Sequence, residues 1–179
     1  YKVLVLDPNN MDDILKDILL VGRVTDRDVE AAILVNDLRR RIDSVVGKVS
    51  GASSRPKVYY EVWYDPIWSV GSEGWENELI EKAGGTNIFA DQKIKYFEAS
   101  SEAIIKSNPD IIIFPLGHEG WPPFWGSFEN VKARPGWDAI NAVRKDRLYT
   151  IDEDIISRPG PRIVDVLETL ARIIHPELF

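Results

Sequence analysis

Aromatic side chains gather in segments that follow predicted strands or lie between them, where they could contact a ligand. In open α/β sheets, ligands bind beyond the carboxyl ends of the strands. Trp and Tyr supply large flat contact surfaces with a polar tip, the composition expected of a site for a bulky, partly apolar ligand. The aromatic residues at this predicted edge are Trp63, Tyr64, Trp68, Tyr96, Phe97, Trp121, Phe124 and Trp125.

Core packing is the alternative role for such residues, because Trp is usually largely buried in folded proteins. Trp75 and Trp137 lie in predicted helices, and we expect both to pack in the core. Trp68, Trp121 and Trp125 lie in predicted loops, and we expect these three to face a ligand.

Catalysis and metal binding find little support in the sequence. The chain has no Cys and only two histidines, His118 and His175, so thiolate chemistry and a metal site made of several imidazoles are excluded. His118 could offer one axial ligand to a metal in a macrocycle, but we interpret it as a solvated loop residue that can titrate. Ser72 lacks the spacing of a nucleophile elbow. We therefore expect no catalytic residue, no metal site and no cofactor apart from a captured ligand.

The composition limits the classes of partner that the chain is expected to bind. The 179 residues carry a formal net charge of -7, and the basic residues are scattered among more numerous acids. Nucleic acids and anionic membrane surfaces attract basic stripes, so both are disfavoured as partners. The chain shows no apolar run of about 18 residues, the length that suggests a membrane span. It begins at Tyr1 with a strand-like segment, and we expect it to be a fragment.

Strands and helices alternate along the chain, a pattern that predicts an α/β fold with a parallel sheet and right-handed crossovers. The element that stands out is a helix over Thr25 to Val49, with an apolar stripe and a cap at Thr25 or Asp26. The stripe should contain Val29, Ala32, Ile33, Leu38, Ile42 and Val45. The predicted strands cover residues 2–7, 57–63, 110–115 and 147–152, and the other helices cover residues 11–21, 75–83, 100–107, 137–143 and 162–174.

Three groups of motifs resemble those of a known family. The run from Trp63 to Asp91 resembles the opening of the carboxyl-terminal lobe in periplasmic binding proteins of cobalamin, heme and ferric siderophore ABC importers. Ser101-Glu102 ahead of Asn108-Pro109-Asp110, and later Arg134-Pro135-Gly136-Trp137, resemble the segments that follow. The resemblance implies two α/β lobes joined by one rigid helix. Residues 1–24 would be a remnant of the amino-terminal lobe, residues 25–49 the connecting helix and residues 50–179 the carboxyl-terminal lobe.

The resemblance also implies a function. The protein would act outside the cytoplasm, where it would capture cobalamin or a related corrinoid in a cleft between the lobes and deliver it to a complex of a membrane permease and an ATPase. A ferric siderophore or heme is the alternative ligand, and an enzyme or regulator that binds a nucleotide or metal is the alternative class. Glu102 would dock onto permease arginines. It also lies in the first turn of a helix whose predicted cap is Ser100, where a carboxylate is stabilising, so a helix-capping role is the alternative. The apolar face of the long helix would favour self-association. The ligand-facing residues would be Trp63, Tyr64, Asp65, Trp68, Tyr96, Trp121, Asp154 and Ile155.

Overall fold

The computed structural model describes residues 2–116 and 128–179, and within them the chain forms a six-stranded sheet in the order β4-β2-β1-β5-β6, with β3 also paired to β1. The pairs β1–β3, β1–β5 and β5–β6 are parallel, whereas β1–β2 and β2–β4 are antiparallel. The α/β class and the mostly parallel sheet are thus as predicted. The strands are β1 (Lys57–Trp63), β2 (Trp68–Val70), β3 (Thr86–Asn87), β4 (Tyr96–Glu98), β5 (Ile111–Leu116) and β6 (Leu148–Asp152).

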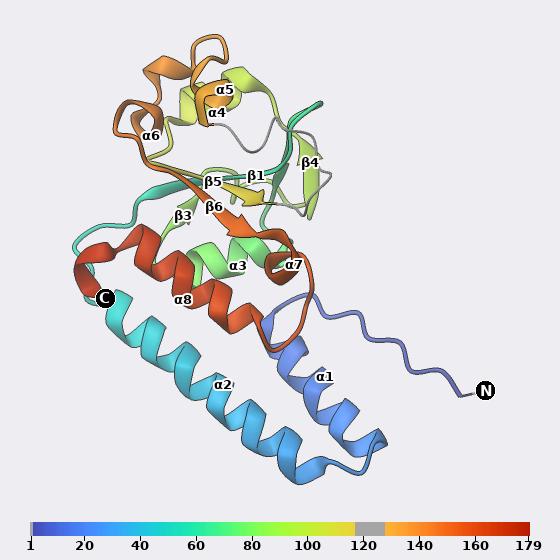
Figure 1. Cartoon of the computed structure of the whole chain (residues 1–179). Coiled ribbons are helices and arrows are strands. Elements are labelled where there is room, and N and C mark those ends of the chain that lie inside the picture. The colour runs from blue at the N-terminus through green and yellow to red at the C-terminus, as the bar shows by residue number, and fades with distance from the viewer. Residues whose placement is uncertain (1, 117–127) are drawn as a thin grey trace.

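Helices cover both faces of this sheet, which gives three layers (Figure 1). Alternate residues of β1 serve the two sides, because Val58 and Tyr60 join one buried cluster and Tyr59 joins the other. One face carries α3 (Trp75–Lys82), α7 (Glu153–Ile156) and α8 (Ile163–Ile174). The opposite face carries α4 (Ser101–Ser107), α5 (Phe128–Lys132), the 3₁₀ turn η2 (Trp137–Ala139) and α6 (Asn141–Arg144), and a last 3₁₀ turn, η3 (Pro176–Leu178), follows α8.

Two long helices, α1 (Met11–Val24) and α2 (Asp28–Val49), form a hairpin that extends from the lobe, and α2 lies beside α8 (Figure 1). Gly22 was expected to end the first helix, but α1 continues through it. A Cβ at this position would clash with the Cβ of Ala31 in α2. Gly22 therefore permits a close helix crossing.

The apolar stripe of α2 is only partly the one predicted. Leu38, Ile42 and Val45 are buried as expected, but Val29 and Ile33 are 70% and 65% exposed. The buried residues are spaced alternately by four and three positions, so they form one continuous stripe along the helix. The first residues of the predicted stripe lie on the adjoining face of the same helix. The residues that α2 buries are Ala31, Val35, Leu38, Ile42, Val45 and Val49.

The start of α2 also differs from the prediction. Its N-cap is Arg27, which makes no side-chain capping bond. Thr25 belongs to the end of α1, where its hydroxyl donates to the carbonyl of Val21 at 2.8 Å. Asp26 has a φ of 55° in the turn. These two residues form the connection between helices, so neither can cap the second.

Residues 2–7 form no strand in the described structure, contrary to prediction. They lead away from the lobe (Figure 1), and Val3 and Val5 are 82% and 80% exposed. A strand needs a neighbouring strand for its backbone hydrogen bonds, and residues 2–7 pair with none of the described strands.

Candidate ligand-binding edge of the sheet

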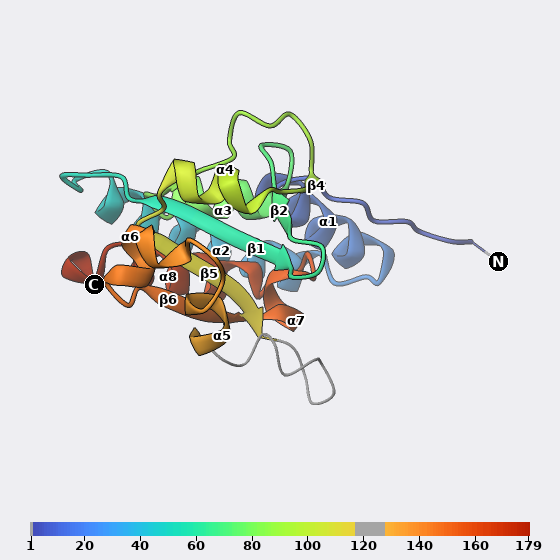
Figure 2. The same cartoon turned by 90° about the horizontal axis from the view of Figure 1, so that it is seen from above.

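Strands β1, β5 and β6 end at one edge of the sheet, beside β2, β4 and α7 (Figure 2). Their parallel registers bring the segment after Trp63 and the segment after Asp152 to the same side of the lobe. Most of the predicted ligand-facing residues lie in these two segments. We call this region the carboxyl edge.

Trp63 and Trp68 lie directly opposite each other where β1 pairs with β2. Their exposed fractions are 39% and 37%, so each presents much of its surface to solvent. Trp63 donates its indole N–H to the backbone carbonyl of Asp65 at 3.1 Å. The structure therefore brings Trp63, Asp65 and Trp68 together, with half-buried Tyr64 between them in the chain.

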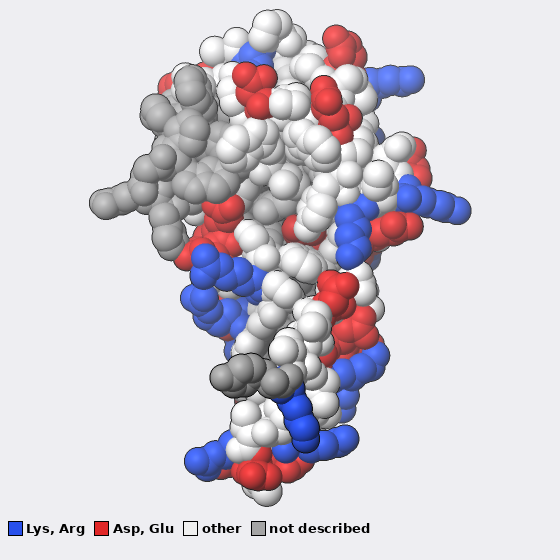
Figure 3. All heavy atoms as spheres, turned by 90° about the vertical axis from the view of Figure 1, so that its right-hand side faces the viewer, with Lys and Arg blue, Asp and Glu red and all other residues white. Residues whose placement is uncertain are grey.

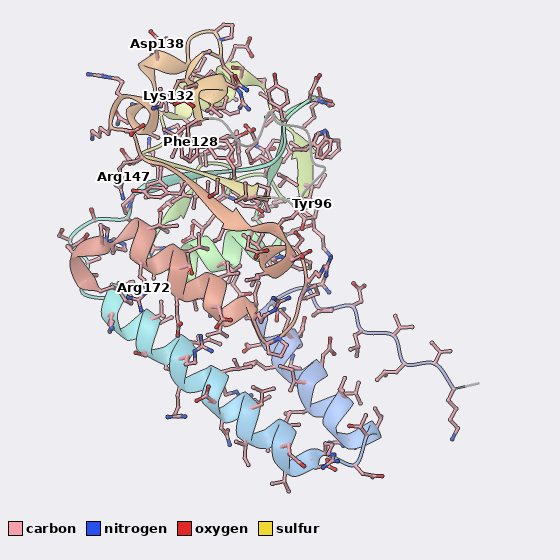
Figure 4. All side chains as sticks on the ribbon, in the orientation of Figure 1. Tyr96, Phe128, Lys132, Asp138, Arg147 and Arg172 are labelled. Carbon is pink, nitrogen blue, oxygen red and sulfur yellow. The ribbon has the colours of Figure 1, made fainter. Side chains whose placement is uncertain are left out.

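Tyr96 also lies at this edge, whereas Arg147 and Arg172 lie toward the opposite end of the lobe (Figure 4). Its ring is half-buried, and its hydroxyl donates to Oε1 of Glu76 in α3 at 2.9 Å. The polar tip of Tyr96 is therefore engaged inside the lobe, which leaves its ring as the part able to contact a ligand.

Glu76 is a buried carboxyl group beneath the carboxyl edge, and sequence analysis missed it. Its exposed fraction is 4%, and Oε2 has no hydrogen-bond partner among the described residues. Burial raises the pKa of Glu76 to about 7, because the low-dielectric interior penalises the charged form, while the hydrogen bond from Tyr96 acts in the opposite direction. Its only sequence signal was an acid in the first helical turn, which usually means a solvated residue.

Asp154 and Ile155 are half-buried in α7, directly after β6. Oδ1 of Asp154 accepts from Arg158 at 2.7 Å, and Ile155 packs against the buried cluster beneath the sheet. Both residues lie at the predicted edge, but each makes contacts within the lobe. Trp121, together with His118, Phe124 and Trp125, lies outside the described residues.

Glu61 and Arg134 form a buried ion pair that sequence analysis also missed. Arg134 donates from both terminal nitrogens to the two oxygens of Glu61, at 2.5 and 2.8 Å. The side chains are 1% and 10% exposed. The guanidinium carbon lies 4.7 Å from the ring centre of Tyr64 and 4.4 Å from that of Trp137. A glutamate inside the apolar run KVYYEVW was the available signal, since a buried charge requires a partner.

The remaining predictions concern helix ends and core residues. Ser100 caps α4 by accepting from the N–H of Ala103 at 3.1 Å, and Glu102 in the first turn is exposed. Trp137 is fully buried, as predicted. Trp75 is half-buried against the core and donates to the carbonyl of Ile156 at 2.9 Å.

Charge is distributed unevenly over the side of the molecule that carries β4 and the N-terminal segment. Figure 3 shows a largely uncharged area in its upper half, with both acidic and basic side chains around it. Among residues 2–116 and 128–179, no group of three or more His, Asp or Glu side chains could hold a metal ion. No helix in the same residues is long and apolar enough to cross a bilayer.

Comparison with known proteins gives consistent matches. A family model described as "Periplasmic binding protein" matches residues 1–155. An uncharacterized ABC transporter substrate-binding lipoprotein, YvrC, of Bacillus subtilis (strain 168) is 30% identical over 98% of this chain and 54% of its own length. A vitamin B12-binding protein of Vibrio cholerae is 28% identical over 74% of this chain and 45% of its own length.

A solved structure also resembles this lobe. It is a possible iron-binding (periplasmic solute-binding) protein of Staphylococcus epidermidis, with a TM-score of 0.84 and 35% identity, covering 97% of this chain and 66% of that one. The chain thus spans about half the length of the curated relatives that it matches.

Proposed function

Because the chain belongs to the periplasmic binding protein family, we propose that it is the carboxyl-terminal lobe and connecting helix of a substrate-binding protein for an ABC importer. Its ligand is cobalamin or a related corrinoid. The observation that carries this assignment is the exposed pair Trp63 and Trp68 at the carboxyl edge of the sheet. Two adjacent indoles offer the flat, partly apolar contact that a macrocycle requires.

The charges at the carboxyl edge support a ligand without strong negative charge. Arg134 lies against Tyr64 but is neutralised by Glu61. Arg158, which is largely exposed, forms an ion pair with Asp154 at 2.7 Å. Both cations therefore offer little net attraction to an anionic ligand, because each has a carboxylate within hydrogen-bonding distance.

The relatives are about twice as long as this chain, which supports a shared site. We propose that the ligand is held between this lobe and a second lobe, with α2 as the link. A single wall makes only part of the contacts, so this chain alone should bind the ligand more weakly than a protein of the relatives' full length.

Delivery requires a surface separate from the ligand site, and we assign this role to Glu102. It is exposed in the first turn of α4, where a carboxylate can pair with arginines on the extracytoplasmic side of a permease, which in turn works with an ATPase. Such a charge pair steers and orients more than it adds affinity. Self-association through the exposed Val29 and Ile33 of α2 stays a prediction.

An iron compound, either a ferric siderophore or heme, is the alternative ligand. The description of the Staphylococcus epidermidis protein as possibly iron-binding favours it. Both ligand classes fit a lobe with exposed aromatic residues, so only binding measurements distinguish them.

Titration of the protein with cyanocobalamin, hemin and ferrichrome, followed by ligand absorbance, tests the assignment. We expect cyanocobalamin to bind at least tenfold more tightly than the other two. Trp63→Ala and Trp68→Ala should each weaken that binding about tenfold, which corresponds to about 1.4 kcal/mol. Val46→Ala, at a position of α2 that is 38% exposed, is the control and should have no effect. Preferential binding of hemin or ferrichrome would refute the corrinoid assignment.

A further inference from the structure

The buried pair of Glu61 and Arg134 lies directly beneath the aromatic carboxyl edge. Glu61 is the fifth residue of β1, on the same face as Tyr59 because side chains alternate along a strand. Its carboxylate accepts from Arg134 at 2.5 and 2.8 Å and from the hydroxyl of Tyr59 at 3.1 Å. These three bonds fix the position of the carboxylate and, through it, the plane of the guanidinium.

Arg134 is also held by a rigid aromatic neighbour, Trp137. The guanidinium carbon lies 4.4 Å from the Trp137 ring centre, and that indole is completely buried. Trp137 donates to the hydroxyl of Ser101 at 2.7 Å and meets Tyr59 edge-on, with the ring centres 6.0 Å apart. Neither the carboxylate nor this indole can move without disturbing the core on that face of the sheet.

Tyr64 is the outermost member of this cluster. It follows the last residue of β1, in a loop, and its ring lies 4.7 Å from the guanidinium carbon of Arg134. A planar guanidinium stacks on an aromatic face, whereas the ammonium of Lys is a compact, strongly hydrated charge. Because the guanidinium of Arg134 is held by the buried cluster, its contact with Tyr64 restricts the movement of that ring at the carboxyl edge.

We propose that Glu61 and Arg134 are positioning residues that hold the Tyr64 ring in the orientation in which it contacts ligand. The ligand part of this inference rests on the proposed function, whereas the orientation of the ring does not. The competing role is purely structural, in which the pair stabilises the lobe and leaves Tyr64 unaffected.

A ligand-independent measurement addresses the ring. 3-Fluorotyrosine placed at position 64 reports the environment of that ring by ¹⁹F NMR. Arg134→Lys keeps the charge but loses the planar fork, so we expect the resonance to shift and its sensitivity to D₂O to increase. Arg144→Lys, at an exposed arginine of α6, is the matched control and should leave both unchanged. An unchanged resonance in Arg134→Lys would overturn the proposal.

A second measurement addresses the ligand contact, with cyanocobalamin as the probe. Arg134→Lys should weaken binding about tenfold in the natural background and have no further effect when Tyr64→Ala is already present. Equal weakening in both backgrounds would show a structural role and overturn positioning. If neither the natural protein nor any variant binds cyanocobalamin, the proposed function fails. The ¹⁹F result still shows whether Arg134 orients the Tyr64 ring.

Folding is checked by circular dichroism, because loss of a buried pair can unfold a lobe. Should Arg134→Lys not fold, Tyr59→Phe is the milder variant, since it removes only the 3.1 Å hydrogen bond to Glu61. It should produce a smaller change of the same kind in the Tyr64 resonance. No change in a folded Tyr59→Phe protein would overturn the proposal.

Discussion

Glu61 and Glu76 are both buried near the carboxyl edge of the sheet, but in different layers and with different partners. Glu61 extends from β1 and receives two hydrogen bonds from Arg134 and one from Tyr59. Glu76 extends from α3, and the described structure gives it one side-chain donor, the hydroxyl of Tyr96. A guanidinium offsets the charge of a buried carboxylate, whereas a neutral phenol does not, so burial raises the pKa of Glu76.

The same chemical group, a buried glutamate carboxyl, therefore has a different role at each of the two sites. The pair of Glu61 and Arg134 contributes fixed geometry beneath Tyr64, and its charge cancels. Glu76 contributes a group whose pKa is raised to about 7 by burial and which accepts a hydrogen bond from the hydroxyl of Tyr96. Both carboxyl groups are buried beneath the aromatic residues that sequence analysis singled out.

Breaking the ion pair should produce the largest effect. Arg134→Ala leaves the Glu61 carboxyl group buried without its main partner, and breaking a buried ion pair in this way costs about 3–5 kcal/mol in the free energy of unfolding. Urea denaturation at neutral pH measures the loss. Lys132→Ala, which removes a pair with Asp146 at the surface, is the control and should cost less than about 1 kcal/mol. A loss below that level in Arg134→Ala would contradict the comparison.

Titrating Glu76 should produce a smaller, pH-dependent effect. Its pKa rises from 4.5 to about 7 on folding, so between these values the folded state binds more protons than the unfolded state. Its contribution to stability is therefore greatest below about pH 4.5 and is lost as the pH rises through about 7, with a total change of about 3 kcal/mol.

Glu76→Gln removes this titration, so it isolates the contribution of Glu76 from those of other groups. The free energy of unfolding of the variant, measured by urea denaturation from pH 4 to pH 8, should fall less with pH than that of the natural protein. Parallel curves for the two proteins would show that Glu76 is not the titrating group.

The smallest effect is expected at Arg41, a partly exposed reference for both buried sites. Arg41 in α2 donates to Glu168 at 2.8 Å and to Asp165 at 2.5 Å, both in α8. The hydrogen bond from Arg41 lowers the pKa of Glu168. Arg41→Ala should cost about 1 kcal/mol or less, because solvent screens the pair.

Thermal unfolding of Arg41→Ala and of the natural protein at low and high salt measures this loss of stability, which should be smaller at high salt because salt screens the charges. Arg40→Ala is the matched control, since that side chain is 78% exposed and its partner among the described residues, Asp37, lies within α2. If Arg41→Ala lowers the free energy of unfolding by more than about 3 kcal/mol at both salt concentrations, Arg41 behaves like the buried pair and the comparison fails.

Local signals in the sequence were sufficient for much of the fold. The run DIIIFP predicted a buried parallel strand, and β5 is paired on both sides by β1 and β6. Ser100 was predicted to cap a helix and does so. Trp63 and Trp68 were predicted at one edge, and strand pairing places them opposite each other. Each of these features depends on neighbours in the chain or on a simple period.

Errors arose where a distant neighbour decides the outcome. Two adjoining faces of the helix over residues 28–49 are apolar, and packing on α1 and α8 selects the one that contains Val35 and Val49. Gly22 resembles a helix stop but serves a close contact with Ala31. Residues 2–7 have strand composition but pair with none of the described strands.

By itself, the sequence determined the order of elements, the α/β class and the aromatic character of the carboxyl edge, because periodicity, caps and composition are local properties. Only the tertiary structure decided the ionisation and pairing beneath that edge. Glu61 and Arg134 are 73 positions apart, and Tyr96 is 20 positions from Glu76. The cost of burying a carboxylate depends on which donor the fold brings to it, and no local pattern specifies that donor.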